Sequence, residues 1–303
     1  MWAERLLARG PGEAPTAGRA RAQFALGGIA LMQGDASGAQ QPLETSVGLY
    51  RAHADRRRLA LGLALLGLAA ASLGTPTIAL DLYRQVVALA RELGDPWMEA
   101  YTLTNQGAAT LLVGEPTAAE ALYQASLSVF TRLGDAWGRS IAIRGLAGLL
   151  LDRGEYASAR ALYDQCVPLF RAAGDARGLA QTLLSLGKAA MRAGSPDRAD
   201  EVFTEALVRW RDLDISGGVV RSLAGLAAVA AARGHPERAT ALFAAATSLA
   251  PSVGVGFAAA DVLEHACIIH DLRARLGQPR FAAVWQTGQA LSLDAAIAAA
   301  LGG

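Results

Sequence analysis

The sequence predicts an all-α fold, a right-handed superhelix of stacked helix pairs. The first observation behind this prediction is a period of about 40 residues, which relates the stretch from Asp95 to Gly134 to the stretches before and after it. A fixed period in roughly this range is typical of solenoid proteins. The second observation is the composition, because hydrophobic residues reach 52% while aromatic residues stay at 6%. The excess is alanine and leucine, which favour helix.

Three positions keep the period without slipping. They carry a glycine, an alanine and an aromatic residue, so one repeat unit and its stacking define the whole fold. The glycines stand at 34, 74, 114, 154, 194 and 234, the alanines at 39, 79, 119, 159, 199 and 239, and the aromatic residues are Tyr83, Tyr123, Tyr163, Phe203 and Phe243.

The register predicts a single domain over residues 1–303. We expect a partial helix in residues 1–14, which looks like the second helix of an incomplete repeat. Six regular helix pairs follow in residues 15–254, and an irregular seventh repeat with capping helices occupies residues 255–303. An array of this length can form one cooperative body because each repeat packs against its neighbours.

The last repeat deviates from the others. Its turn glycine, Gly277, lies three residues beyond the place that the period assigns to it. We predict two shorter helices after it, at about 279–289 and 292–301. Terminal repeats often deviate in this way because one of their faces has no neighbour to cover it.

Turn residues fix the ends of the two helices in each repeat. The first helix ends at a glycine that is often followed by proline two residues later, as in Gly74 and Pro76. Glycine is favoured at the end of a helix, and proline is tolerated in the first turn of the next. The second helix ends at a Gly-Asp pair such as Gly94 and Asp95, where the aspartate can cap the following helix.

One stretch imitates a membrane span. Residues 59–74 form a nearly unbroken apolar run, just short of the roughly 18 to 20 residues that cross a bilayer. The same register positions carry polar residues in the next repeats, at 101–114 and 141–154. The run therefore predicts a buried helix of the second repeat.

A small residue recurs in the middle of the first helix. Glycine inside a helix costs roughly 0.5 to 1 kcal/mol relative to alanine, so its return at Gly67, Gly107 and Gly187 needs a reason. We interpret it as close packing against the alanine that recurs in the second helix, twelve residues later. The aromatic residue four residues further, such as Tyr123, would then fill the gap toward the next repeat.

A small residue followed by alanine at +12 and an aromatic residue at +16 resembles the tetratricopeptide repeat (TPR), and the resemblance covers nearly the whole chain. The 40-residue unit is similar to the arrays of bacterial transcription regulators of the maltose-regulator and LuxR-like type, which are STAND signalling ATPases. The resemblance implies a C-terminal sensor or protein-binding domain of a larger bacterial protein. Other domains of such a parent would lie outside this sequence.

Charge and cysteine content restrict the partners. Lysine and arginine total 28 and aspartate and glutamate 27, so no overall field attracts nucleic acid or anionic lipid. The run Arg56 to Arg58 is interpreted as a solvated face. Cys166 occupies a core position of the second helix, and two cysteines are too few for a disulfide framework. The first 20 residues hold no apolar signal segment, so we expect a cytoplasmic protein without membrane contact.

Catalytic motifs are missing from the sequence. It has no phosphate-binding G-x-x-x-x-G-K-[ST] loop and no G-x-S-x-G elbow around a serine. His265 and His270 are five residues apart, which places them about 140° apart on a helix and excludes the i, i+4 pair of a zinc helix. We therefore predict a protein that is not an enzyme and that needs no cofactor or metal.

In tetratricopeptide arrays the first helices line a concave groove. The resemblance implies that positions −6, −3, −2, +1, +4 and +5 from the small residue face this groove, and we call them the inner positions. They are apolar in the first repeats and basic in the later ones, which suits a protein or peptide segment with an apolar and an acidic part, or a small anionic effector. The candidate binding residues are Tyr101, Asn105, Arg144, Gln181, Lys188, Arg192 and Arg221.

Alternatives stay open at this point. Lys188 and Arg192 are four residues apart on one helix and could simply be solvated, with Asp152 pairing one of them. The whole chain could be a freestanding adaptor that joins two proteins, or a peptide-pheromone receptor. The lysine and asparagine clamp that this family uses for peptide carboxylates is not reproduced, because Asn105 and Arg144 do not match its pattern.

Overall fold

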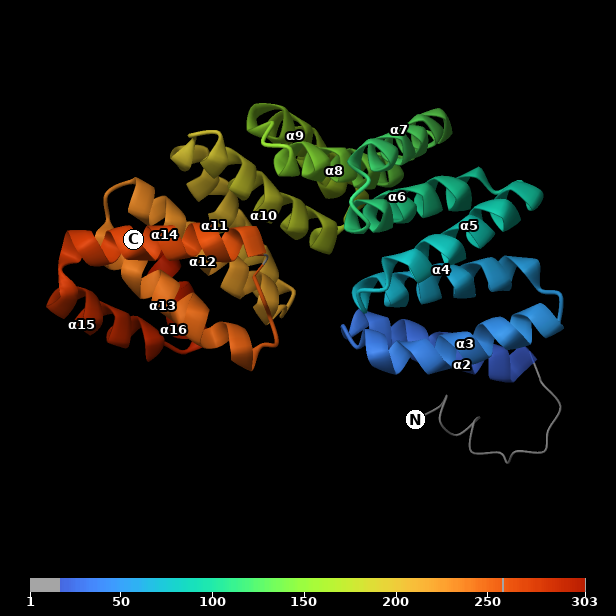
Figure 1. Ribbon diagram of the computed structural model, residues 1–303, viewed down its shortest axis with the longest axis horizontal. Helices are drawn as coiled ribbons and strands as arrows, with labels where there is room; N and C mark the ends of the chain where they lie inside the picture. Colours follow the sequence, from blue (N-terminus) through green and yellow to red (C-terminus); the bar gives the residue numbers. More distant parts are fainter. Residues whose placement is uncertain (1–16, 258, 303) are drawn as a thin grey trace. The chain divides into compact units, whose positions relative to one another are not determined.

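The computed structural model describes residues 17–257 and 259–302, and all regular structure in these residues is helical (Figure 1). The prediction of an all-α fold is confirmed, whereas the predicted helix in residues 1–14 lies outside the described residues. The first helices of the repeats are α2 (Ala17–Met32), α4 (Arg56–Ser72), α6 (Pro96–Leu112), α8 (Ala136–Asp152), α10 (Ala176–Arg192) and α12 (Ser216–Ala232). The second helices are α3 (Ala36–Ala52), α5 (Pro76–Glu92), α7 (Pro116–Leu133), α9 (Tyr156–Ala173), α11 (Pro196–Asp212) and α13 (Pro236–Ser252). The chain continues with α14 (Ala259–Leu276), α15 (Gln278–Gln289) and α16 (Leu293–Leu301).

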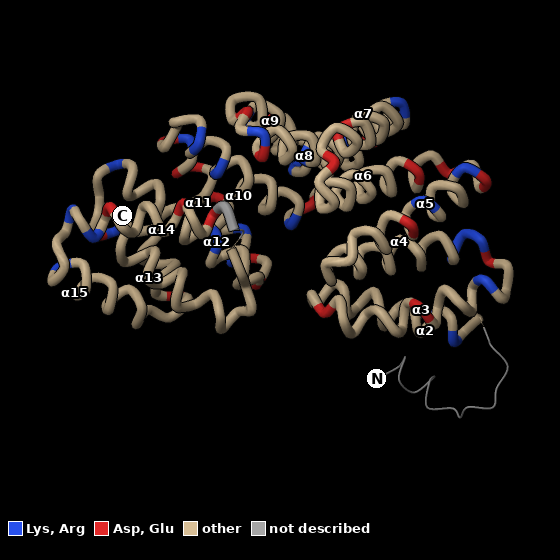
Figure 2. Tube along the Cα trace, in the orientation of Figure 1, with Lys and Arg blue, Asp and Glu red and all other residues tan. Residues whose placement is uncertain are grey.

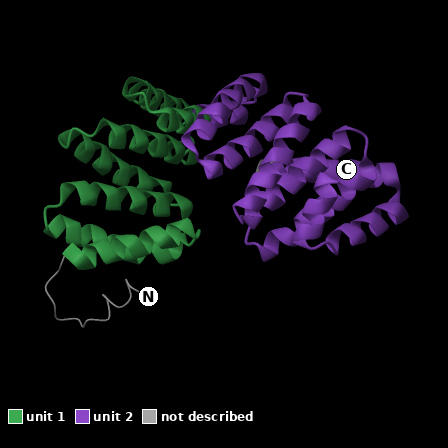
Figure 3. Cartoon of the chain, turned by 180° about the vertical axis from the view of Figure 1, so that it is seen from behind, with its two compact units in different colours: residues 1–145 green, residues 146–303 purple. Residues whose placement is uncertain are grey.

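The chain divides into two compact units, unit 1 with residues 1–145 and unit 2 with residues 146–303 (Figure 3). The boundary falls within α8. Inside each unit, helices that follow one another in sequence pack side by side, as in α2 with α3 and in α10 with α11. The organisation of residues 1–303 as one domain stays a prediction.

The helix ends lie where the turn residues predict them. Gly74 and Gly94 adopt the left-handed conformation, with φ of 74° and 61°, which glycine reaches without strain. The Asp95 carboxylate accepts a hydrogen bond from the backbone N–H of Met98 at 2.9 Å and so caps α6. The equivalent Asp175 caps α10 in the same way.

The small position of the first helix packs against an aromatic ring. A Cβ atom on Gly67 would lie 2.6 Å from a ring carbon of Tyr83, closer than nonbonded carbons approach. Our interpretation placed the alanine of the second helix there. The atoms nearest to Gly67 are those of the ring four residues further along that helix, whereas at the equivalent Gly27 the backbone oxygen of Ala39 would lie 3.2 Å from a Cβ atom. The ring of Tyr123 also lies against Gly145 of the following first helix, so the aromatic residue fills the gap between repeats as predicted.

The apolar run of residues 59–74 lies mostly in α4, as predicted. Ala60 and Leu63 are buried, but Leu61 and Leu68 are 42% and 40% exposed, so the helix is not buried on all sides. Among the described residues no helix is both long and apolar enough to cross a membrane.

The short helices predicted after Gly277 are present as α15 and α16. The first helix of the seventh repeat, however, leaves the register of the regular repeats. In the regular repeats the next first helix packs along the preceding second helix, as α4 does along α3. After α13 this place is taken by α15 instead. The displaced helix, α14, forms ion pairs with α10 and lines a cavity with α10 and α12. This displacement brings the acidic start of α14 to the inner positions of unit 2.

Candidate binding surface on the inner helix positions

The inner positions of unit 1 hold apolar side chains that remain exposed. On α4 these are Leu61 and Leu68, and on α6 Leu112 is 62% exposed. Met32 at the end of α2 is 78% exposed. Helix packing in this unit leaves these side chains wholly or partly uncovered, so they offer apolar surface that is available for contact.

Three of the predicted binding residues lie in residues 1–145. Tyr101 is half-buried, and its ring stacks on the rings of Trp97 and Trp137 at centroid distances of 5.3 and 5.9 Å. The ring is therefore held in an aromatic cluster, which the repeat pattern did not predict. Asn105, on α6, and Arg144, on α8, are both half-buried at inner positions.

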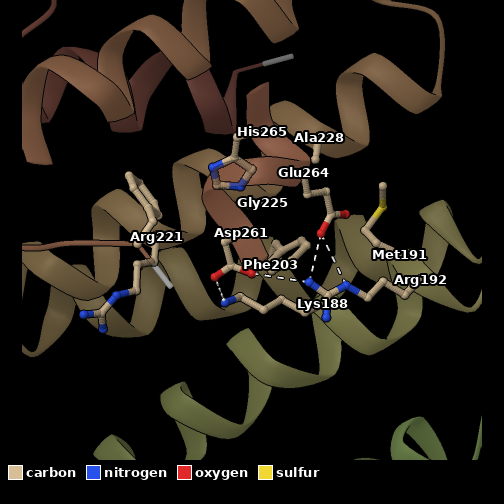
Figure 4. Close-up of a pocket in the computed structure, with 11 residues that line it drawn as sticks. Lys188, Met191, Arg192, Phe203, Arg221, Gly225, Ala228, Asp261, Glu264 and His265 are labelled. Carbon is tan, nitrogen blue, oxygen red and sulfur yellow. Dashed lines mark hydrogen bonds and ion pairs between the residues drawn. The ribbon is translucent and has the colours of Figure 1, made fainter. Parts of the chain in front are cut away.

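The basic end of the predicted surface is covered by α14. Lys188 Nζ lies 2.5 Å from Asp261 Oδ2, and Arg192 Nη2 lies 2.9 Å from Glu264 Oε2 (Figure 4). Arg192 Nη2 also lies 3.5 Å from Asp261 Oδ1, so Asp261 joins both cations. The alternative in which Lys188 and Arg192 are merely solvated beside Asp152 is therefore wrong, since their carboxylate partners come from α14.

Apolar contacts continue the same interface along α14. Ile268 and Leu272 follow Asp261 by seven and eleven residues and line a cavity with Met191 and Ala228. Leu272 is buried, whereas Val262 and Leu263 on another face of the helix are 50% and 69% exposed. The helix is thus amphipathic, and its polar and apolar contacts with unit 2 lie on one stripe.

Burial and charge act together at this interface. Burial between the rings of Phe243 and Phe257 lowers the pKa of His265, although the nearby carboxylates of Asp261 and Glu264 oppose the effect. Burial alone would lower the pKa of Arg192, but the hydrogen bonds to Glu264 and the negative charges of Glu264 and Asp261 together raise it. An imidazole that stays neutral and a guanidinium that stays charged both favour the arrangement seen here.

The other two predicted residues of unit 2 do not join the ion pairs. Arg221 lines a cavity beside α14, and its side chain points away from the paired groups (Figure 4). Gln181 is half-buried near the start of α10. The structure thus brings Lys188, Arg192 and Arg221 to one region of unit 2.

Asp261, Glu264 and His265 were not among the residues predicted from the sequence. Their spacing of three and four residues places them on one helix face, with the apolar positions 268 and 272 further along. This amphipathic stripe with an acidic start was visible in the sequence. Its pairing with Lys188 was not, because 73 residues separate Lys188 from Asp261.

Charged groups elsewhere are spread along the described chain in both signs (Figure 2). The run of three arginines at the start of α4 pairs with carboxylates, with Arg57 Nη2 3.4 Å from Asp95 and Arg58 Nη1 2.6 Å from Asp55. Arg56 pairs with Glu92. The side chains of all three arginines are nonetheless about half or more exposed, which agrees with the interpretation of a solvated face. Within the described residues, no group of three or more His, Cys, Asp or Glu side chains could hold a metal ion.

Comparison with known proteins agrees with the repeat. The family model for the tetratricopeptide repeat matches residues 98–172 and 138–212. A search for relatives among curated proteins finds no match. Residues 98–212 therefore match the tetratricopeptide repeat, and the chain as a whole resembles an array of such repeats.

Solved structures share the fold at low sequence identity. Aspartyl phosphate phosphatase F from Bacillus subtilis has a TM-score of 0.65 and 13% identity, with 90% of this chain and 71% of that chain covered. A STAND protein with a tetratricopeptide repeat sensor from Pyrococcus horikoshii has a TM-score of 0.59 and 16% identity, with 78% of this chain but only 37% of that chain covered. A Rap protein complexed with Competence and Sporulation Factor has a TM-score of 0.51 and 14% identity, with 67% and 61% covered.

Proposed function

We propose that this tetratricopeptide-repeat array binds a segment of another protein, or a peptide, along the inner positions of its first helices. The observation that carries the proposal is the exposed apolar surface of unit 1, formed by Met32, Leu61, Leu68 and Leu112. Exposed large apolar side chains at inner positions of three successive first helices fit the contact surface of a partner better than a solvated face.

The same array would act as the sensor of a larger bacterial regulator. The fold shared with the repeat sensor of a STAND protein supports this finer proposal. The fold shared with a Rap protein complexed with Competence and Sporulation Factor supports a peptide or protein ligand. A sensor role requires that the ligand bind two states of the parent with unequal affinity. An adaptor would bind its partner without such a difference.

A small anionic effector is less favoured as ligand. Two of the cations that would attract it, Lys188 and Arg192, are already paired with carboxylates of α14. Catalysis has no support from any described cluster of side chains. The proposed role is therefore that of a binding module, and its absence of enzyme activity stays a prediction.

The test is a selection of helical peptides on the full chain by phage display, followed by affinity measurements. The double variant Leu68→Glu/Leu112→Glu places two charges on the apolar surface, and we expect it to weaken binding of the selected peptides at least about tenfold. Ile78→Glu is the matched control, because Ile78 is 54% exposed on a second helix, outside the inner positions. Equal affinity of the double variant and the wild type would contradict the proposal.

A further inference from the structure

The helix α14 contacts unit 2 through the positions that we assigned to a ligand. Lys188, Met191 and Arg192 are inner positions of α10, and Arg221 and Ala228 are inner positions of α12. All of them line the cavities next to α14. By contrast, the side chains at inner positions of unit 1 include exposed leucines. A segment of the chain itself thus occupies in unit 2 the kind of surface that is open in unit 1.

The polar part of the contact has high specificity. Asp261 is 8% exposed and sits between two cations, so its charge is compensated only while α14 stays in place. Glu264 Oε2 accepts a hydrogen bond from Arg192 Nε at 3.3 Å and from Nη2 at 2.9 Å. A guanidinium that bonds a carboxylate through two nitrogens recognises its geometry as well as its charge.

The apolar part of the contact is incomplete. Ile268 is only half-buried, and an open cavity of about 270 Å³ remains between it, Met191 and Leu272. Unfilled volume forfeits packing energy that a better-fitting helix would gain. The connection from α13 to α14 is also loosely packed at Gly256, where a Cβ atom would have no neighbour within 4 Å. The polar anchor is therefore specific, while the apolar contact leaves room for improvement by another helix.

We infer that the inner surface of α10 and α12 is a docking site for an acidic amphipathic helix, that α14 is its resident ligand, and that a partner helix of the same pattern displaces it. The pattern is read from the contacts, with acids at positions 1 and 4 and large apolar residues at positions 8 and 12, as in Asp261, Glu264, Ile268 and Leu272. The inference rests on the proposed function and names the class of partner for unit 2. A competitor can bind only those molecules in which the site is open. Its apparent affinity is therefore its intrinsic affinity multiplied by the fraction of molecules with an open site.

The test measures binding of a fluorescently labelled peptide of residues 261–276, carrying Cys267→Ser, to the full chain by anisotropy. The loosened variant Asp261→Asn/Glu264→Gln weakens the resident helix, and we expect it to bind the peptide at least about tenfold more tightly than the wild type does. A second peptide with the same two replacements should not bind. Adding Lys188→Glu/Arg192→Glu to the loosened variant should abolish binding of the first peptide.

Equal binding of the peptide by the wild type and the loosened variant, or no binding by either, would overturn the inference. Circular dichroism shows whether the loosened variant keeps its helix pairs, and hydrogen exchange of α14 in the wild type with excess peptide gives an independent measure of displacement. A loosened variant that dimerises in sedimentation experiments instead of binding the peptide would assign the site to a second copy and reject a partner helix. If the inference fails while peptides selected on the full chain still bind in a way that depends on Leu68 and Leu112, the proposed function stands without it.

Discussion

At Gly107 the structure leaves no room for a side chain, because a Cβ atom there would lie 2.9 Å from the ring of Tyr123. Tyr123 itself is 3% exposed and cannot turn into solvent without opening the repeat. The glycine thus sets how closely the first and second helices approach. Its lower helix propensity is offset by the burial of a large ring.

Replacing Gly107 by leucine should destabilise the protein by about 1 to 3 kcal/mol, the usual cost of overpacking a core. The matched control is Gly48→Leu, since Gly48 lies inside α3 and a Cβ atom there would meet open space. At that position the substitution should stabilise by up to about 1 kcal/mol through helix propensity. Urea denaturation followed by circular dichroism compares the two, and equal midpoints would contradict the packing that we describe at Gly107.

Single residues differ in how far the sequence predicts them. The register placed Cys166 in the core, and it is fully buried. It also predicted a glycine fitted to close packing at position 107, but not that the aromatic ring supplies the atoms nearest to it. The period shows which positions are equivalent. It does not show which of two neighbouring side chains on a helix reaches the glycine, since that depends on side-chain length and rotamer.

Among the helices, α14 combines an acidic start with a titratable centre. His265 lies 5.1 Å from Phe243 and 5.2 Å from Phe257 between ring centroids. Burial lowers its pKa, while Asp261 and Glu264 raise it and Lys188 lowers it further. The docked state of α14 therefore favours the neutral imidazole.

This preference predicts that acid loosens α14. His265 has an ordinary pKa of 6.5 when exposed, and a lower one when docked. Below pH 6.5 the undocked state binds more protons, so the docked state loses stability as the pH falls from about 6.5 through the lowered pKa, and keeps it above that range. Hydrogen exchange, expressed as protection factors for α14, should show this loss.

The variant His265→Leu is the control, because it keeps an apolar side chain of similar volume and cannot titrate. Its protection factors should no longer change between pH 7.5 and the range just below 6.5. If α14 of the wild type keeps the same protection factors across this pH range, protonation of His265 does not affect the docking of α14.

Element boundaries were highly predictable, whereas the place of α14 was not. Glycine and aspartate turns mark the helix ends in sequence because they act locally, on the backbone of one turn. The register also predicted the short helices after Gly277. The route of α14 depends instead on attraction between Lys188, Arg192 and two acids more than 60 residues later, which no periodic pattern connects.

At the scale of the whole molecule, the two units present their inner positions in different states. Unit 1 leaves leucines of α4 and α6 exposed, and unit 2 holds a helix of its own chain over α10 and α12. The sequence predicted the change from apolar to basic inner positions. It did not predict that α14 already occupies the basic part. A partner that binds there must therefore compete with α14.

The claim that α14 docks through its charges is tested most directly by exchanging them. In the full chain, Lys188→Glu/Arg192→Glu and Asp261→Lys/Glu264→Arg each place like charges opposite one another, and hydrogen exchange should show that each loses protection of α14. The combined quadruple variant restores opposite charges across the same contact, and we predict that it regains most of the protection. Unchanged protection in the two double variants, or no recovery in the quadruple variant, would contradict the account.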